Sequence, residues 1–159
     1  MNQELEKPMK KNKMANPMRN PKISKVVLSA GAVGPDLDKA VKLLEMLSGM
    51  KVQIIKSGPK KRIPAFSVKP NMPLGARVTL RGGKAITLLK RALGAVDNTL
   101  KENSVDKNTF SFGIKEYIEI PEVEYVREIG IRGFNVTVTF ERAGVRVKKR
   151  KNTKKTKCY

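Results

Sequence analysis

The amino-acid sequence predicts an α+β fold of two layers, in which helices pack on one face of a mostly antiparallel sheet. Several short segments alternate apolar and polar residues, as strands with one buried face do, and 134–140 is the most regular of them. Two longer segments, which begin near residues 35 and 83, carry apolar residues at helical spacing. The elements follow in the order strand, helix, strand, strand, helix, strand, strand.

The length of 159 residues suits one domain with charged ends. We expect a basic, flexible N-terminal arm over 1–21, a single α+β domain over 22–145 and a basic C-terminal tail over 146–159. The tail carries eight Lys or Arg residues and no acidic one. Such a run repels itself and has almost no apolar surface to bury, so we expect it to become ordered only against a polyanion.

The first half of the domain begins with a buried strand over 23–28 and a turn of small residues over 29–34. A helix is predicted from Pro35, because proline suits the first helical turn and two aspartates follow where the helix dipole favours negative charge. Gly49 is its expected end, and a second strand fits 51–55. The predicted apolar face of this helix consists of Leu37, Ala40, Val41, Leu44 and Leu47.

A basic loop over 56–73 follows, with five Lys or Arg residues, four prolines and no acidic residue. Because prolines limit the conformational entropy that a loop loses on ordering, we interpret the basic loop as a polyanion-binding segment rather than plain surface. The next strand, 75–81, places Arg77, Thr79 and Arg81 on one face and apolar residues on the other. This pattern predicts a half-buried strand with a basic open face.

In the second half, Gly82 and Gly83 lead into a second helix and Phe110–Ile114 alternates as a short strand. Residues 116–128 are acidic and interrupted by proline, and we interpret them as a solvated segment or one that faces protein. The last strand is 134–140. The predicted apolar face of the second helix consists of Ile86, Leu89, Leu93, Val96 and Leu100.

Two glycine-containing turns resemble phosphate-binding motifs but lack residues that those motifs require. Gly31–Gly34 follows a strand, yet Ser29 stands where a dinucleotide fingerprint has its first glycine. In Gly82–Lys84, the following Ala85 replaces the hydroxyl residue that would hold magnesium. We interpret both as structural turns, although backbone amides at the first helix could still hold one phosphate.

The net charge of +20 and the lack of histidine decide between classes of function. The lack of histidine excludes His-based triads, His metal sites and His general bases, and we expect no cofactor, no metal and no enzymatic activity. A single cysteine and no long apolar run predict a cytoplasmic protein without a membrane partner. The charge favours nucleic acid, and an aromatic content of only 5% favours folded RNA over single strands stacked on aromatic rings.

Four blocks of the sequence resemble the large-subunit ribosomal protein L-five family of archaeal type, the universal ribosomal proteins that bind 5S rRNA. The blocks are ISKVVLSAG at 23–31, GARVTLRG at 75–82, FSFGIKE at 110–116 and the segment 128–142. The second and third blocks, in this order and at this separation, are the most specific. The resemblance spans about residues 16–150, and IPAF at 63–66 is more similar to archaeal members than to bacterial ones.

The resemblance implies a structural constituent of the large ribosomal subunit in the central protuberance. Its implied partners are 5S rRNA, large-subunit rRNA, neighbouring large-subunit proteins and, through the basic loop, P-site tRNA. With the open strand face and the basic tail, the rRNA-binding candidates are Ser29, Lys51, Arg77, Thr79, Arg81, Arg146, Lys148, Lys149, Arg150 and Lys151. The candidates on the loop toward tRNA are Lys60, Lys61, Arg62, Phe66, Ser67 and Lys69.

Two positions depart from the family pattern. The family usually has Asn where this chain has Ser29, so the polar contact there would be shorter or bridged by water. Met50 stands where Gln is frequent and is not counted as a contact. The main alternative function is a basic architectural DNA-binding protein, which charge alone permits. An enzyme of nucleotide chemistry and a peripheral membrane protein are both disfavoured, the latter because neither helix pairs its apolar face with a strongly basic one.

Overall fold

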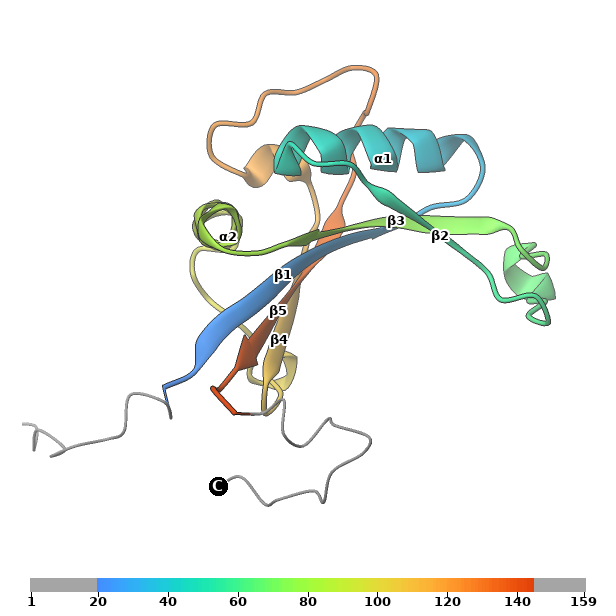
Figure 1. Cartoon of the computed structure of the whole chain (residues 1–159). Coiled ribbons are helices and arrows are strands. Elements are labelled where there is room, and N and C mark those ends of the chain that lie inside the picture. The colour runs from blue at the N-terminus through green and yellow to red at the C-terminus, as the bar shows by residue number, and fades with distance from the viewer. Residues whose placement is uncertain (1–19, 145–159) are drawn as a thin grey trace, which may run out of the picture. The chain divides into compact units, whose positions relative to one another are not determined.

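The computed structural model describes residues 20–144, of which Ile23–Phe140 form one compact unit (Figure 1). The strands and helices are β1 (Lys22–Gly31), α1 (Pro35–Ser48), β2 (Gln53–Lys56), β3 (Pro73–Leu80), α2 (Gly83–Gly94), β4 (Thr109–Ile114) and β5 (Phe134–Glu141). Short 3-10 helices lie at η2 (Pro64–Phe66), η3 (Glu102–Ser104) and η4 (Tyr117–Glu119). No helix within 20–144 has the length and apolar character that crossing a membrane requires.

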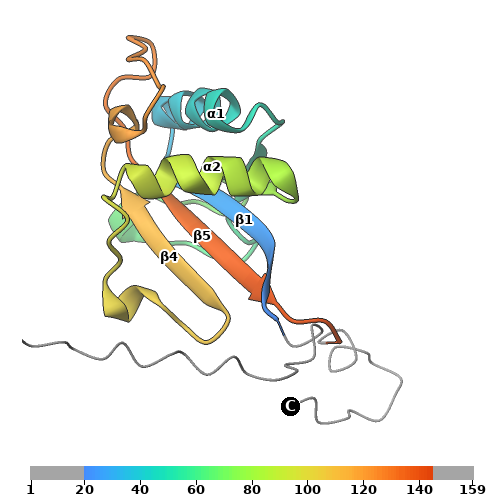
Figure 2. The ribbon, with the colours of Figure 1, turned by 90° about the vertical axis from the view of Figure 1, so that its left-hand side faces the viewer.

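The five strands form a single antiparallel sheet in the order β2-β3-β1-β5-β4. The β1–β3, β2–β3 and β4–β5 pairs are antiparallel by register, and Figure 2 shows β5 running opposite to β1. The connection β1–α1–β2 skips one strand position, which β3 then fills, as in a split β-α-β unit. The predicted class, an α+β fold with a mostly antiparallel sheet, is confirmed.

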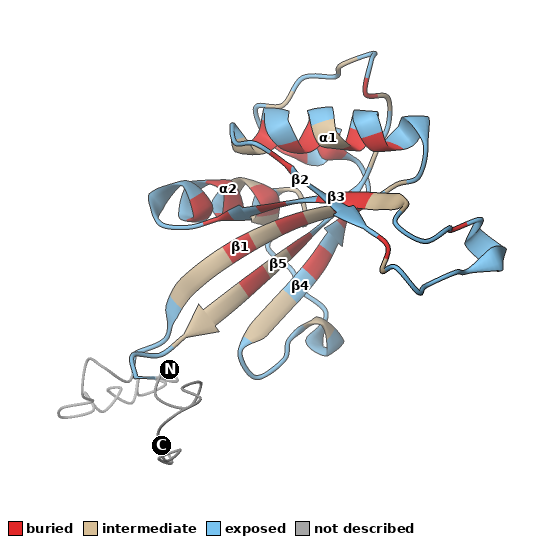
Figure 3. Ribbon diagram, turned by 45° about the vertical axis from the view of Figure 1, so that its right-hand side comes forward, coloured by how far each residue is buried: buried red, intermediate tan, exposed pale blue. Residues whose placement is uncertain are grey.

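Both helices cover the same face of the sheet, because alternate strand residues and the inner sides of α1 and α2 belong to one apolar core. The strands contribute Val26, Leu28, Ala30, Ala76, Val78, Leu80, Phe112, Ile114, Phe134, Val136 and Val138 to that core. No helix formed by residues 20–144 covers the other face (Figure 3). Its side chains alternate with the buried ones, which fulfils the expectation of helices packed on one face.

The first helix follows the sequence closely. It begins at Pro35 and ends where Gly49 adopts a left-handed conformation, with the Gly49 N–H donating to the Glu45 carbonyl at 2.8 Å. Four of the five predicted core positions are buried, and Val41 is half-buried. Leu43 is also buried, which the prediction omitted.

The predicted apolar face of the second helix was partly wrong. Helix α2 ends at Gly94, so Val96 and Leu100 lie beyond it, and Ile86 is 45% exposed. The residues that α2 buries are Ala85, Leu88, Leu89 and Ala92. With alanine at two of these positions, the buried side of α2 carries its bulk at Leu88 and Leu89, and Ile86 faces solvent.

The segment 115–133 forms no strand and is tied to both helices by ion pairs. The Lys42 ammonium donates to a Glu128 carboxylate oxygen at 2.8 Å, Arg132 pairs with Asp36, and Arg91 Nε lies 3.5 Å from a Glu122 carboxylate oxygen. The hydrogen bond between Lys42 and Glu128 raises the pKa of the Lys42 ammonium and lowers the pKa of the Glu128 carboxyl group. Part of the acidic character of this segment therefore serves attachment within the chain.

Candidate nucleic-acid interface

The face of the sheet without helices, which we call the open face, presents polar side chains, most of them short. Its polar members on the four strands β1, β3, β4 and β5 include Ser29, Arg77, Thr79, Ser111, Asn135, Thr137 and Thr139. Apart from Arg77, none of these side chains forms a hydrogen bond to another described residue. Donors and acceptors that the fold leaves unused on one flat surface can bind a polar ligand.

The predicted contacts Ser29, Arg77 and Thr79 lie on the neighbouring strands β1 and β3, and register places Ser29 directly opposite Arg77. The exposed Arg81 follows β3 at the same alternation, so it extends this row. The row therefore combines two cations with two hydroxyl groups, a composition that suits phosphate and ribose oxygens.

Gln53 on the edge strand β2 is a member of this surface that the sequence did not single out. It lies opposite Arg77, and Arg77 Nε donates a hydrogen bond to Gln53 Oε1 at 3.0 Å. This bond leaves the terminal nitrogens of the guanidinium group for a ligand. The predicted contact Lys51 is exposed and lies two residues before β2 begins at Gln53. Because β2 and β3 are antiparallel, this places Lys51 on the side of Thr79.

The basic loop joins β2 to β3 and is held at its base by the buried Ser57. The Ser57 hydroxyl donates to the Lys69 carbonyl at 2.7 Å and accepts from the Met72 N–H at 3.1 Å. Toward the tip, Ile63 and Val68 form a β-bridge around η2. The loop is thus organised by the Ser57 hydroxyl and by its own backbone, although almost all of it is exposed (Figure 3).

All six predicted residues of the basic loop are exposed, namely Lys60, Lys61, Arg62, Phe66, Ser67 and Lys69. Phe66 is 74% exposed at the end of η2, and Ser67 follows it in a left-handed conformation with φ 53°. Residues 20–144 do not include Arg146, Lys148, Lys149, Arg150 and Lys151, so these predicted contacts and the basic tail lie outside the described part of the chain.

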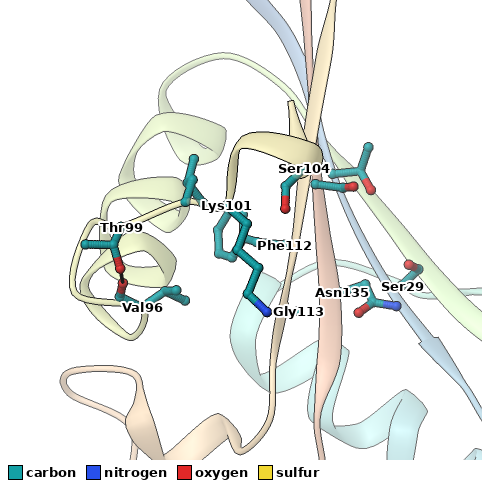
Figure 4. A pocket seen from close by; sticks show the side chains of 11 residues that line it. Ser29, Val96, Thr99, Lys101, Ser104, Phe112, Gly113 and Asn135 are labelled. Carbon is teal, nitrogen blue, oxygen red and sulfur yellow. Dashed lines mark hydrogen bonds between the residues drawn. The ribbon is translucent and has the colours of Figure 1, made fainter. Parts of the chain in front are cut away.

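A depression of about 700 Å³ opens where the open face meets the segment between α2 and β4 (Figure 4). Ser29, Gly113 and Asn135 line it from the sheet, and Leu100 and Lys101 line it from the segment after α2. A second depression of about 400 Å³ shares the three sheet residues. Neither Asn135 nor Lys101 was predicted from the sequence, where only the alternation of the last strand placed Asn135 on the polar face.

Comparisons with known proteins show which family the chain resembles. A family model described as the ribosomal L5P family C-terminus matches residues 73–158. The chain is similar to the large ribosomal subunit protein uL5 of Nanoarchaeum equitans, with 43% identity over 87% of this chain and 82% of the relative. It is 41% identical to the uL5 of Methanococcoides burtonii over 89% of this chain and 85% of that protein, and 41% identical to the uL5 of Aeropyrum pernix over 88% and 73%. The chain belongs to the ribosomal L5P family.

Proposed function

We propose that this protein is a structural, non-enzymatic constituent of the large ribosomal subunit, that it binds 5S rRNA with its open face, and that its basic loop extends toward P-site tRNA. Membership of the ribosomal L5P family supports the ribosomal assignment and a cytoplasmic location on the ribosome. The partners are rRNA and neighbouring large-subunit proteins. The two RNA assignments rest on the chemistry of the surfaces.

The open face is the observation that carries the 5S rRNA assignment. Ser29, Thr79 and Arg81 offer hydroxyl and guanidinium donors that no described residue occupies. The described residues of this face include no exposed aromatic ring, so the surface suits the sugars and phosphates of a folded RNA better than a single strand stacked base by base.

The basic loop supports a second, separate RNA contact. It projects beyond the ends of β2 and β3 (Figure 1), and its cations are exposed without ion pairs to described residues. Because Ser57 and the Ile63–Val68 bridge already order the backbone, little conformational entropy is lost when the loop meets a polyanion. Phe66 adds one exposed ring on which a base of a folded RNA can stack.

The direct test is equilibrium binding of the full-length protein to 5S rRNA, with Arg81→Glu as the variant and Lys90→Glu as the matched control. Both residues are exposed, but Lys90 lies on α2, on the opposite side of the sheet. We expect Arg81→Glu to weaken binding at least about tenfold, because losing one charge-assisted hydrogen bond alone costs about 1.5–3 kcal/mol. Lys90→Glu should have a much smaller effect.

Equal losses for the two variants would contradict the assignment to the open face, since net charge alone would then explain binding. Duplex DNA that competes as well as 5S rRNA would instead favour a basic architectural DNA-binding protein. Sedimentation of a cell lysate tests the ribosomal assignment itself, and protein that remains free of the large subunit would refute it.

A further inference from the structure

We propose that the larger depression on the open face binds one unpaired adenosine of the RNA, with Asn135 reading the base and Lys101 binding its phosphate. This inference rests on the proposed RNA-binding function and specifies what one part of the open face recognises. The depression, at about 700 Å³, lies within the range of pockets that hold small ligands. It can receive a nucleotide that is already turned out of a helix, whereas a base-paired nucleotide would first have to be unpaired and unstacked, at a cost in free energy.

The floor of the pocket is a glycine that leaves space for an amide. Gly113 lies directly opposite Asn135 in the β4–β5 register. A β-carbon at position 113 would lie only 3.0 Å from Asn135 Oδ1, so the asparagine amide lies across β4 where any other residue would crowd it. The missing side chain thus leaves the amide room beside β4, where the edge of a planar base can meet it.

The Asn135 amide is free to pair with a base. It is exposed and has no hydrogen bond to any other residue in the described part of the chain. An asparagine amide combines one acceptor with donors, and this arrangement matches the N6 donor and the N7 acceptor of adenine in a bidentate pair. Guanine presents two acceptors at the corresponding edge, so it fits the amide less well.

The remaining walls supply what a nucleotide needs besides its base edge. Lys101 comes from the segment after α2, and its side chain points toward β4 beside Gly113 (Figure 4). Its ammonium group is a natural partner for a phosphate. Leu100 provides apolar surface for a base face, and the hydroxyls of Ser29 and Ser111 provide partners for a ribose.

Analogue interference on 5S rRNA tests the base contact. Transcripts that carry 7-deazaadenosine at random adenosines lack the N7 acceptor at those positions, and selection for bound RNA reveals where N7 matters. We expect interference at one unpaired adenosine with the wild-type protein and loss of that signal with Asn135→Ala, which should also weaken binding roughly 5- to 150-fold, the range of one bidentate base contact. Asn108→Ala, an exposed asparagine outside the pocket, is the control and should keep both the signal and the affinity.

An unchanged interference pattern in Asn135→Ala, with RNA binding otherwise intact, would overturn the pocket assignment while leaving the proposed function in place. Titration of isotope-labelled protein with AMP, GMP, CMP and UMP tests the pocket without 5S rRNA. AMP should shift the Asn135 side-chain amide and the Gly113 backbone amide at several-fold lower concentration than the others, and Lys101→Gln should weaken this response. Equal responses to all four nucleotides would overturn the adenosine assignment, even if 5S rRNA itself failed to bind.

Discussion

A single glycine sets how closely β1 and β3 approach near the start of β3. Gly75 pairs with Gly31, and a β-carbon at position 75 would lie 2.7 Å from the Ala30 carbonyl oxygen. We expect Gly75→Ala to lower the free energy of unfolding by about 1–3 kcal/mol, the usual cost of an overpacked site, in urea denaturation. Gly31→Ala is the control, because a β-carbon there meets nothing within 4 Å. Equal stability of the two variants would show that the strands separate without cost.

At the scale of single residues, the sequence predicted which residues lie on the open face better than it predicted the contacts between their side chains. Alternation along 75–81 placed Arg77 and Thr79 on the open face, and the family resemblance added Ser29. Strand order and register determine two contacts that the sequence did not predict. These are the Arg77–Gln53 hydrogen bond and the close approach of the Asn135 amide to Gly113. Register is the pairing of residues that lie far apart in the sequence. It therefore cannot be predicted from the periodicity of one segment alone.

At the scale of an element, the organisation of the basic loop depends on one buried hydroxyl. Ser57→Ala removes both of its hydrogen bonds and leaves the Met72 N–H without its side-chain acceptor. We expect faster amide hydrogen exchange at Val68 and Met72, because two hydrogen bonds worth about 0.5–1.5 kcal/mol each are lost and the Met72 N–H keeps only its longer bond to the Lys69 carbonyl, at 3.3 Å. Exchange within β1 should stay unchanged.

The matched control for that substitution is Ser111→Ala, which removes an exposed hydroxyl with no hydrogen bond to a described residue. It should leave exchange in the basic loop at the wild-type rate. If Ser57→Ala also leaves it unchanged, the prolines and the Ile63–Val68 bridge alone organise the loop. In binding assays, Ser57→Ala should weaken the contact with tRNA more than the contact with 5S rRNA.

The attachment of segment 115–133 to α1 should depend on pH in one direction. The bond from Lys42 holds the pKa of Glu128 below the ordinary value of 4.5, so this carboxylate favours the folded state above that value and loses its contribution as the pH falls through its folded pKa. We expect Glu128→Gln to lower amide protection at Ile129 and Gly130 at neutral pH, with the difference from wild type vanishing in acid. Glu124→Gln, an exposed carboxylate without an ion pair to a described residue, should match wild type at every pH.

The predicted boundaries and buried faces of the helices were correct where proline or glycine marks a helix end. They were partly wrong where packing against the sheet determines which residues are buried. Helix α1 has Pro35 at its start and Gly49 at its end, and both signals were correct. Helix α2 has no proline or side-chain cap, and its long apolar series continues past Gly94 into the connection to β4. Alanine at two inner positions, rather than the larger Ile86, determines which side meets the sheet, and small residues carry little weight in a hydrophobic pattern.

For the whole molecule, a net charge of +20 makes affinity for RNA a function of salt, and the proposed function divides that charge between surfaces that meet different RNAs. A protein that neutralises about 6–10 phosphates loses roughly 10³–10⁵ in affinity between 50 and 200 mM salt, with a log–log slope of about 0.7–0.9 for each phosphate. We expect 5S rRNA binding to fall steeply in this way. A flat response would contradict the electrostatic mechanism.

The division of charge can be measured by neutralising one surface at a time in the full-length protein. Glutamine at the five predicted tail contacts, Arg146, Lys148, Lys149, Arg150 and Lys151, should reduce the slope for 5S rRNA by about 4, because each lost phosphate contact removes about 0.7–0.9. Glutamine at Lys60, Lys61, Arg62 and Lys69 of the basic loop removes nearly as much charge. If the loop faces tRNA, this second variant keeps the wild-type slope for 5S rRNA and lowers the slope for tRNA. Similar reductions in the 5S rRNA slope for both variants would mean that the loop and the tail contact the same RNA.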